Sequence, residues 1–216
     1  MIKFENVTAT YKKNIGVFNI SFKVDSGNMV FIMGPTGSGK STILKTIYKE
    51  MLIDSGSITI DDEDITSINS SMHTSKIRKK IGMVFQDFKL LPDYTVFENI
   101  ALPLRIQGYS RIKINDLVQE SLNKVGLARG GSLYPLQLSG GEQQRVCIAR
   151  ALVKKPRIIL ADEPTGNLDP NISDEILDLL EICTDSGATV LMSTHNFPLI
   201  KPRNKKFIEL SQGRMI

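Results

Sequence analysis

Short runs of hydrophobic residues, several of them alternating with polar ones, recur in the first and last thirds of the chain. Alternation is typical of a strand with one buried face, whereas a continuous apolar run is typical of a strand buried on both faces of a parallel sheet. Residues 2–7 and 18–24 alternate, and residues 29–33 (MVFIM) are continuously apolar. Further strands are predicted at residues 58–60, 81–85, 158–161 and 188–193.

Between residues 86 and 155 the pattern changes to helical spacing. Thr95 and Glu98 stand three residues apart, as in a capping box, and predict a helix that ends near Gly108. Further helices are predicted at residues 113–125, after residue 139, and, beyond this part, at residues 173–183.

The order of these elements indicates an α/β fold with a helical interruption. We predict a single domain, residues 1–216, whose core consists of residues 1–85 and 156–216 and whose inserted helical subdomain is 86–155.

Composition and charge narrow the function classes. Hydrophobic residues make up 41% and charged residues 23% of the chain, as in soluble globular proteins, and no apolar run approaches the length of a membrane span. The first residues lack the apolar core of a secretory signal, so an intracellular protein is predicted, with membrane contact through a partner. Cys147 and Cys183 lack metal-ligand spacing and are expected to be inert thiols.

Basic residues cluster at 76–80 and at 201–206, although the formal net charge is only +4. Each cluster is either a solvated face or a surface close to an anionic membrane. Neither is interleaved with aromatic residues, so no nucleic-acid partner is expected.

A glycine-rich segment follows the apolar strand at residues 29–33 and precedes a helical pattern that runs to about residue 48. Within it, Gly34, Gly39, Lys40 and Ser41 match the phosphate-loop pattern G-x4-G-K-S. Backbone amides of such a loop converge on phosphate oxygens, and the start of the next helix favours the same anion. Lys40 is predicted to pair with the β- and γ-phosphates, and the Ser41 hydroxyl to bind Mg²⁺. The predicted nucleotide-binding residues of this loop are Gly34, Pro35, Thr36, Gly37, Ser38, Gly39, Lys40, Ser41 and Thr42.

Two adjacent carboxylates, Asp162 and Glu163, follow the apolar strand at residues 158–161. Ligands of open α/β sheets bind at the carboxyl ends of the strands, so both side chains are expected at the phosphate site. We predict that Asp162 holds Mg²⁺, directly or through water, and that Glu163 deprotonates the attacking water as general base. Glu163 therefore favours hydrolysis over binding alone.

The segment LSGGEQ, residues 138–143, resembles the signature sequence of the ATP-binding cassette (ABC) family. Taken alone it predicts a capped helix start, with Ser139 as N-cap and Glu142 completing a capping box. The segment ADEPTGNLD, residues 161–169, extends the resemblance through Asp162 and Glu163 to Asp169. The chain is thus similar to ABC ATPases from end to end. The resemblance implies a P-loop (RecA-like), mostly parallel sheet with an N-terminal antiparallel β subdomain and an inserted α-helical subdomain.

The same resemblance implies roles for residues that the pattern alone does not single out. Gln86 matches a glutamine that senses the metal and the water, which would make it both a catalytic residue and a Mg²⁺ ligand. His195 matches the switch histidine that bonds the γ-phosphate, although Asn196 departs from the aspartate common after it. Tyr11 lies where the family has an aromatic residue on adenine; the alternative is an ordinary strand aromatic.

In the family, the signature of one subunit closes over the nucleotide of another, so the resemblance implies a homodimer, or a dimer with a related subunit, in the ATP state. Ser139 and Gly141 would reach the γ-phosphate in trans, and Asp169 would help to shape the partner's site. The signature residues assigned to this contact are Ser139, Gly140, Gly141, Glu142 and Gln143.

Residues 85–99, FQDFKLLPDYTVFEN, resemble the small ABC ATPases that act on FtsX-type and related membrane partners. That group includes FtsE of cell division, LolD of lipoprotein release and MacB-like efflux ATPases, and the stretch from Gln86 onward is most similar to FtsE. This implies a cytoplasmic ATPase, peripheral on the inner face of the cell membrane, that couples ATP-driven dimerisation to an FtsX-like partner and to the control of cell-wall hydrolases. The alternative is the ATPase of a lipoprotein, peptide or drug exporter.

The membrane partner is expected to bind a groove near Gln86 and Phe97. Leu90, Leu91, Tyr94 and Phe97 would line it, since a helix bound in a groove needs exposed apolar contacts. The alternative is that these four residues pack the insert.

Overall fold

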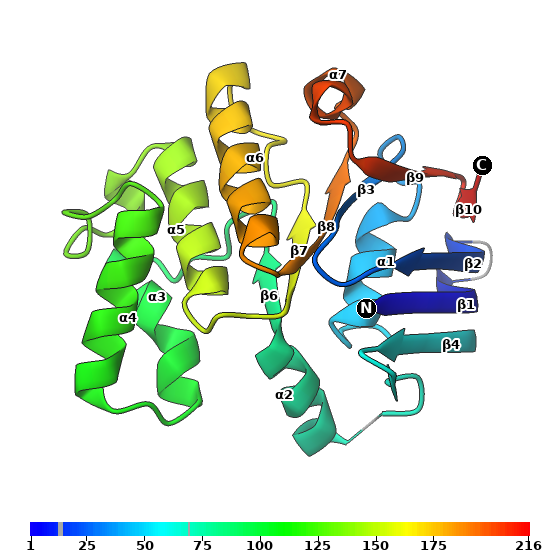
Figure 1. Ribbon diagram of the computed structural model, residues 1–216, viewed down its shortest axis with the longest axis horizontal. Helices are drawn as coiled ribbons and strands as arrows, with labels where there is room; N and C mark the ends of the chain where they lie inside the picture. The colour runs from blue at the N-terminus through cyan, green and yellow to red at the C-terminus, as the bar shows by residue number, and fades with distance from the viewer. Residues whose placement is uncertain (13–14, 69) are drawn as a thin grey trace.

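Two β-sheets and the helices around them form the molecule, and a computed structural model describes residues 1–12, 15–68 and 70–216 (Figure 1). The six-stranded sheet has the strand order β10-β9-β3-β8-β7-β6, and the four-stranded sheet the order β2-β1-β4-β5. The larger sheet contains β3 (Met29–Met33), β6 (Ile81–Val84), β7 (Ile158–Asp162), β8 (Thr189–Thr194), β9 (Lys206–Ser211) and β10 (Arg214–Met215). The smaller contains β1 (Ile2–Lys12), β2 (Ile15–Val24), β4 (Ser55–Ile60) and β5 (Glu63–Asp64).

Pairing in the two sheets follows the predicted fold. Strands β9, β3, β8, β7 and β6 pair in parallel, and β10 joins β9 antiparallel at the edge. In the smaller sheet β1 pairs antiparallel with β2 and β4, and β4 with β5. A mostly parallel core with an N-terminal antiparallel sheet is therefore confirmed.

Helices cover both faces of the parallel sheet, and three of them gather at the end opposite the antiparallel sheet (Figure 1). The helices at that end are α3 (Val96–Ile106), α4 (Arg111–Lys124) and α5 (Gly140–Leu152). All three come between β6 and β7 in the chain, as the predicted insert requires, whereas its limits at residues 86 and 155 stay a prediction. The other helices are α1 (Lys40–Ile47), α2 (Ser71–Lys80), α6 (Pro170–Asp185), α7 (Phe197–Ile200) and the 3₁₀ turns η1 (Pro135–Gln137) and η2 (Lys201–Arg203).

The continuous apolar run of β3 is explained by the two hydrophobic cores on either side of the sheet. Met29 and Phe31 face the core shared with α3, α4 and α5, while Val30 and Ile32 face the core shared with α1 and the antiparallel sheet. Successive side chains of a strand point to opposite faces, so a strand covered on both sides must be apolar throughout.

Several features differ from the sequence-based expectations. Strands β9 and β10 follow β8 in the chain and extend the sheet on the other side of β3, where the sequence predicted no strand. Helix α2 occupies the basic stretch at 76–80 that the sequence assigned only a surface. Cys147 is buried in α5 and Cys183 is half-buried in α6, and burial raises the pKa of both thiols, as expected of inert cysteines. Within the described ranges, no helix is long and apolar enough to cross a membrane.

Candidate nucleotide-binding site

The loop between β3 and α1 adopts a conformation that requires its glycines. Gly34, Gly37 and Gly39 have φ angles of 151°, 81° and 105°, values that side chains disfavour. A Cβ on Gly34 would lie 2.3 Å from the Leu210 carbonyl oxygen, and one on Gly39 would lie 2.5 Å from Val17 Cγ1. The loop therefore packs against β9 and β2 with its backbone, as close approach to a phosphate also demands.

The start of α1 offers backbone donors. Gly39 is its N-cap residue and supplies no side-chain acceptor, and the first turn contains no acidic residue. The first amide groups of a helix have no partner within the helix, and the helix dipole adds positive potential there. This terminus is thus suited to an anion.

Lys40 is almost fully buried, and its ammonium has three acceptors. Nζ donates to the carbonyl oxygens of Gly34 at 2.8 Å and Pro35 at 3.1 Å, and it forms an ion pair with Glu163 Oε1 at 3.0 Å. An ammonium has three N–H donors, so each of them is matched by one acceptor.

The two carboxylates that the sequence placed at this site lie beside Lys40 and Ser41. Ser41 Oγ donates to Asp162 Oδ1 at 2.9 Å. Glu163 has a φ of 42°, in the left-handed region that non-glycine residues seldom adopt and that is enriched at functional sites. Its second oxygen, Oε2, lies 2.9 Å from His195 Nδ1. Glu163 thus joins Lys40 to His195.

Ser193 belongs to the site although the sequence analysis did not single it out. Its hydroxyl donates to Asp162 Oδ1 at 2.7 Å and accepts from the Glu163 backbone N–H at 2.9 Å. Ser193 is the register partner of Asp162 in the β7–β8 pair. A serine at the end of the strand before His195 was the available signal, but the sequence alone does not say which strands are neighbours.

A cavity of about 310 Å³ opens beside the loop. Gln86, Glu163 and Tyr11 line it, and Tyr11 is 52% exposed, with Lys45 Nζ 5.8 Å from its ring centre. The predicted loop residues that line the cavity are Thr36, Gly37, Gly39, Lys40, Ser41 and Thr42; Ile15 and Gly16 were not predicted.

Three predicted loop residues lie outside that lining. Gly34 and Pro35 reach the site through their carbonyl oxygens on Lys40, while Ser38 is buried. Within the described part of the chain, Ser38 Oγ has no hydrogen-bond partner.

The signature segment lies elsewhere on the chain. The predicted capping box is present: Ser139 Oγ accepts from the Glu142 N–H, and Glu142 Oε2 accepts from the Ser139 N–H at 2.8 Å. The Ser139 hydroxyl also donates to Glu142 Oε2, at 2.7 Å, and this bond together with the one from the Ser139 N–H lowers the pKa of Glu142. Gly140 and Gly141 form the first turn of α5, and Gln143 Nε2 donates to the Leu138 carbonyl at 3.1 Å. No signature residue, 139–143, lines the cavity beside Lys40.

Asp169 and Asn196 both act as helix caps. The Asp169 carboxylate accepts from the N–H groups of Asn171 and Ile172 at 3.1 Å and caps α6. Asn196 Oδ1 accepts from the Leu199 N–H at 3.2 Å and caps α7. Because aspartate and asparagine cap helices about equally well, the departure from aspartate at position 196 leaves the local structure intact.

Comparison with known proteins decides the family. The sequence model of the ABC transporter family matches residues 17–166, from β2 through both carboxylates. The chain belongs to the ABC transporter family. It is an ATPase of that family, as the sequence predicted.

Two relatives and one solved structure match it over their length. "Cell division ATP-binding protein FtsE" of Escherichia coli (strain K12) is 44% identical and covers 100% of this chain and 97% of its own. The protein of the same name from Mycobacterium tuberculosis is 43% identical, with coverages of 100% and 94%. A dimeric structure of an ATP-binding cassette in a post-hydrolysis state, bound to ADP and Pi, superposes with a TM-score of 0.88 at 39% identity, covering 100% and 96%.

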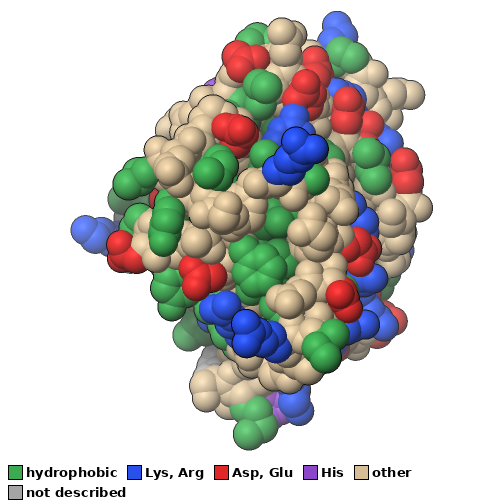
Figure 2. Space-filling view, turned by 90° about the vertical axis from the view of Figure 1, so that its left-hand side faces the viewer, with side chains coloured by type: hydrophobic (Ala, Val, Ile, Leu, Met, Phe, Trp, Pro, Cys, Tyr) green, Lys and Arg blue, Asp and Glu red, His purple; other side chains and the backbone are tan. Residues whose placement is uncertain are grey.

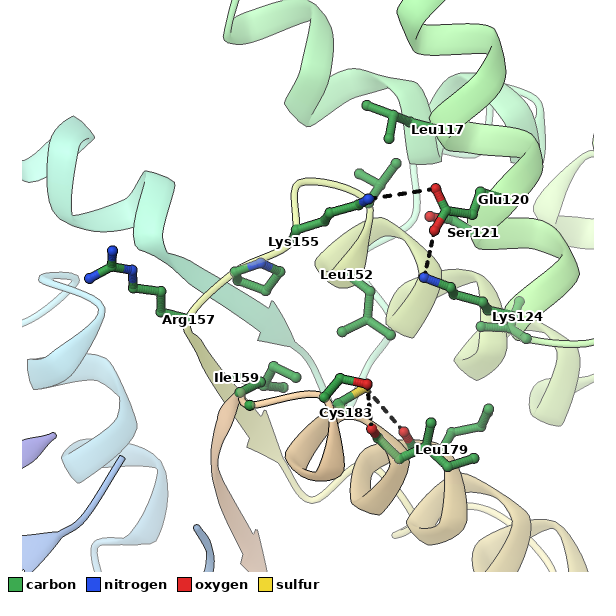
Figure 3. Close-up of a pocket in the computed structure, with 17 residues that line it drawn as sticks. Leu117, Glu120, Ser121, Lys124, Leu152, Lys155, Arg157, Ile159, Leu179 and Cys183 are labelled. Carbon is green, nitrogen blue, oxygen red and sulfur yellow. Dashed lines mark hydrogen bonds and ion pairs between the residues drawn. The ribbon is translucent and has the colours of Figure 1, made fainter. Parts of the chain in front are cut away.

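A second cavity, of about 470 Å³, lies between α4, α5 and α6 and shares no lining residue with the first (Figure 3). Apolar side chains such as Leu152, Ile159 and Leu179 form its floor. It is less polar than the site around Lys40 and contains none of the predicted site residues. Its size alone therefore does not make it the reaction site.

Proposed function

We propose that this ABC ATPase is the ATP-hydrolysing subunit of an FtsE-type complex of cell division. ATP-driven dimerisation would act on an FtsX-like integral membrane protein and thereby control cell-wall hydrolases. Two FtsE relatives that are 43% and 44% identical over the whole chain support this role. They favour cell division over the LolD- or MacB-like exporter.

The residues around Lys40 suit hydrolysis of ATP. Lys40 would bind the β- and γ-phosphates, while Tyr11 would contact the adenine ring. Glu163, once the nucleotide has displaced it from Lys40, would accept a proton from the attacking water, and His195 would bond the γ-phosphate. Gln86 lines the same cavity and would orient that water.

The oxygen donors near Lys40 fit Mg²⁺ bound together with the nucleotide. Among the described residues, no group of three or more His, Cys, Asp or Glu could hold a metal ion alone. Ser41 Oγ and Asp162 Oδ1 lie 2.9 Å apart, and Gln86 faces the same cavity. Magnesium commonly takes one carboxylate, waters and substrate phosphates, so Ser41, Gln86 and Asp162 would hold it. The ion would neutralise phosphate charge.

The observation that carries the proposed dimer is that the signature lies apart from Lys40 within one chain. Residues 139–143 contribute nothing to the lining of the 310 Å³ cavity, although the N–H groups at the start of α5 suit a phosphate. A second copy would bring its signature to this cavity, with Ser139, Gly140 and Gly141 at the γ-phosphate and Glu142 and Gln143 supporting the turn. The dimeric cassette of similar fold supports this arrangement.

Glu163→Gln tests the dimer. The variant should bind ATP, hydrolyse it very slowly and elute as a dimer in light-scattering chromatography with ATP and Mg²⁺. Adding Ser139→Arg should return a monomer, because the arginine would fill the space of the γ-phosphate contact. Adding Ser132→Arg, an exposed serine of the same insert, is the matched control and should leave the dimer.

Two results would oppose the proposal. If wild type releases no phosphate with ATP and Mg²⁺, with or without its membrane partner, the chain is a nucleotide-bound scaffold. If Glu163→Gln stays monomeric in ATP even when purified with that partner, the signature does not act in trans.

The groove proposed for the membrane partner combines exposed and packed residues. Leu91 and Tyr94 are each 38% exposed, whereas Leu90 and Phe97 pack against the core beneath them. Figure 2 views the end of the molecule on which α3 and α4 lie and shows hydrophobic side chains at the centre of that face. Leu91 and Tyr94 would contact the partner, and Leu90 and Phe97 would hold the surface in place.

A pull-down from membranes tests this groove and the peripheral location at the inner face of the membrane. Leu91→Asp should lose an FtsX-like protein while keeping basal ATP hydrolysis. Ile112→Asp is the matched control, since Ile112 is 77% exposed on α4 and lies outside the proposed groove. Equal capture by both variants would remove Leu91 from the interface, and capture of an exporter subunit would favour the alternative function.

A further inference from the structure

The cavity of about 470 Å³ in Figure 3 lies at the amino ends of β7 and β8, on the side of the sheet opposite Asp162 and His195. Its other walls are the C-terminal turns of α4, α5 and α6. Small-molecule sites of proteins commonly measure roughly 300–1,000 Å³. None of the residues that we assign to the nucleotide or to the membrane partner lines this cavity. It is therefore large enough for a ligand and separate from both proposed sites.

The floor of the cavity is apolar surface that the fold leaves partly uncovered. Ile182 at its border is 59% exposed. Five other apolar side chains of the lining pack against the core shared with α3, α4 and α5 but are only partly buried there: Leu117, Leu152, Leu179, Cys183 and Ala188. Removing such surface from water is favourable, so an apolar body that covers it would bind through the hydrophobic effect.

The mouth of the cavity carries more positive than negative charge. Among the described residues that line it, Glu120 is the single acidic one, and it pairs with both Lys124 at 2.7 Å and Lys155 at 3.8 Å (Figure 3). Two ammonium groups against one carboxylate leave one positive charge. Arg157 points away from the other labelled side chains and pairs with Asp61 at 3.6 Å. The charge that remains at the mouth is therefore that of the lysines.

Lys155 can leave Glu120 without a large loss of stability. The distance of 3.8 Å between Lys155 Nζ and Glu120 Oε2 is longer than a hydrogen bond, and the two side chains are 68% and 44% exposed. Exposed ion pairs contribute little to stability. Glu120 would keep its closer partner, Lys124. Lys155 is thus free to turn to an incoming anion.

The floor and the mouth together define the class of ligand. The apolar floor favours a hydrocarbon or aromatic body, and one positive charge at the mouth favours a single anionic group. A nucleotide carries several phosphate charges and needs more cations and polar donors than surround this cavity. A carboxylate carries one charge and accepts hydrogen bonds from an ammonium group. These features match a small apolar molecule with one carboxylate.

We propose that the cavity between α4, α5 and α6 binds a small apolar carboxylic acid. The apolar body covers Leu152, Leu179 and Cys183, and the carboxylate accepts a hydrogen bond from Lys155 Nζ in place of Glu120. The bound acid contacts the C-terminal ends of α5 and α6, whose N-terminal ends carry the signature turn and the Asp169 cap. The chain then has a ligand site that depends neither on the nucleotide nor on the membrane partner proposed above.

Calorimetric titration of the purified chain with octanoate, hexanoate and 1-octanol tests this site. Octanoate should bind about 15 times more tightly than hexanoate, because each of its two additional methylene groups contributes a factor of about four when the apolar floor buries it. 1-Octanol has the same chain length without the charge and should bind about two to five times more weakly than octanoate.

Two variants locate the ligand. Lys155→Gln should weaken octanoate binding by about two- to fivefold and leave 1-octanol binding unchanged. Lys113→Gln makes the same change at an exposed lysine of α4 outside the cavity and should alter neither. Leu179→Gln should weaken both ligands by about fivefold or more. Leu136→Gln, at a leucine that is 85% exposed outside the cavity, is the matched control and should leave both affinities unchanged.

The proposal fails if octanoate does not bind wild type, or if hexanoate binds as tightly as octanoate, which would indicate an ion pair on the surface. It also fails if Lys155→Gln weakens octanoate binding no more than Lys113→Gln does. Because Lys155 is 68% exposed, Lys155→Gln should unfold at the same urea concentration as wild type, and it decides the question even if Leu179→Gln does not fold. The titrations contain no ATP, Mg²⁺ or membrane partner, so their failure leaves the proposed function standing.

Discussion

The ion pair between Lys40 and Glu163 should compete with nucleotide for the Lys40 ammonium. All three donors of Nζ already have protein acceptors, two of them neutral carbonyl groups and one the Glu163 carboxylate. A phosphate oxygen that takes one donor must displace one acceptor. The carboxylate is the acceptor that a phosphate repels, so Glu163 is expected to move. We predict that Glu163→Gln binds ADP more tightly than wild type does.

The geometry sets the size of the effect. The pair is 3.0 Å long, and the side chains are only 4% and 12% exposed. Coulomb's law at an effective dielectric constant of about 20 gives roughly 5.5 kcal/mol for this separation, before desolvation is subtracted. A hydrogen bond to a charged group contributes about 1.5–3 kcal/mol net, which corresponds to ADP binding roughly 10 to 150 times tighter in the variant.

Calorimetric titration with ADP in the presence of EDTA measures this gain. ADP excludes hydrolysis, and the chelator excludes any contribution of Glu163 through a metal ion. Glu50→Gln removes one exposed negative charge near the end of α1 and serves as the control for general electrostatics. Affinities of wild type and Glu163→Gln within threefold of each other, or an equal gain in Glu50→Gln, would refute the competition.

Three further outcomes follow from packing and burial. Gly141→Ala should lower ATP hydrolysis, because its Cβ would lie 2.9 Å from Ile172 Cγ2. Adding Ile172→Ala should restore part of the rate, and if it restores none, the loss does not come from this contact. Burial lowers the pKa of Lys154 in the folded chain to about 8. Between about pH 8 and 10.5 the folded chain has therefore lost a proton that the unfolded chain still holds. Stability of wild type relative to Lys154→Met, from urea unfolding, should therefore rise with pH across that window, and a flat difference would contradict the shift. Cys147 and Cys183 should react slowly with N-ethylmaleimide at pH 7.5 and rapidly in urea, since burial raises both pKa values; rapid labelling of the folded chain, followed by mass spectrometry, would contradict this.

Most elements with a regular hydrophobic pattern could be predicted from the sequence. The predicted strand at residues 29–33 coincides with β3. The predicted capping box of Thr95 and Glu98 is present, and α3 begins one residue after Thr95. Both signals are local: the first is set by burial on two faces, and the second by two side chains three residues apart. The glycines of the phosphate loop belong to the same class, because their positive φ angles are required by the turn itself.

The features that the sequence did not reveal depend on contacts between distant segments. Strand β9 begins within a basic cluster, and only its pairing with β3 gives it a place in the sheet. Ser193 joins the site because β8 lies next to β7, a neighbour relation that no local pattern contains. Helix α2 buries only Ile77 among its described residues, so its hydrophobic periodicity is too weak to be recognised.

The packing of α5 on α6 relates the two halves of the proposed trans site. Gly141 lies where any Cβ would meet Ile172, and Arg145 of α5 forms an ion pair with Glu175 of α6. Asp169 caps α6 one turn from Ile172, so the signature turn and the segment that begins α6 rest on one another. A shift of Asp169 caused by nucleotide at the Asp162–Glu163 end of the same loop would therefore move the signature as well. Because the signature is proposed to serve the nucleotide of the second copy, this contact would let each site sense the other through van der Waals packing rather than through a flexible linker.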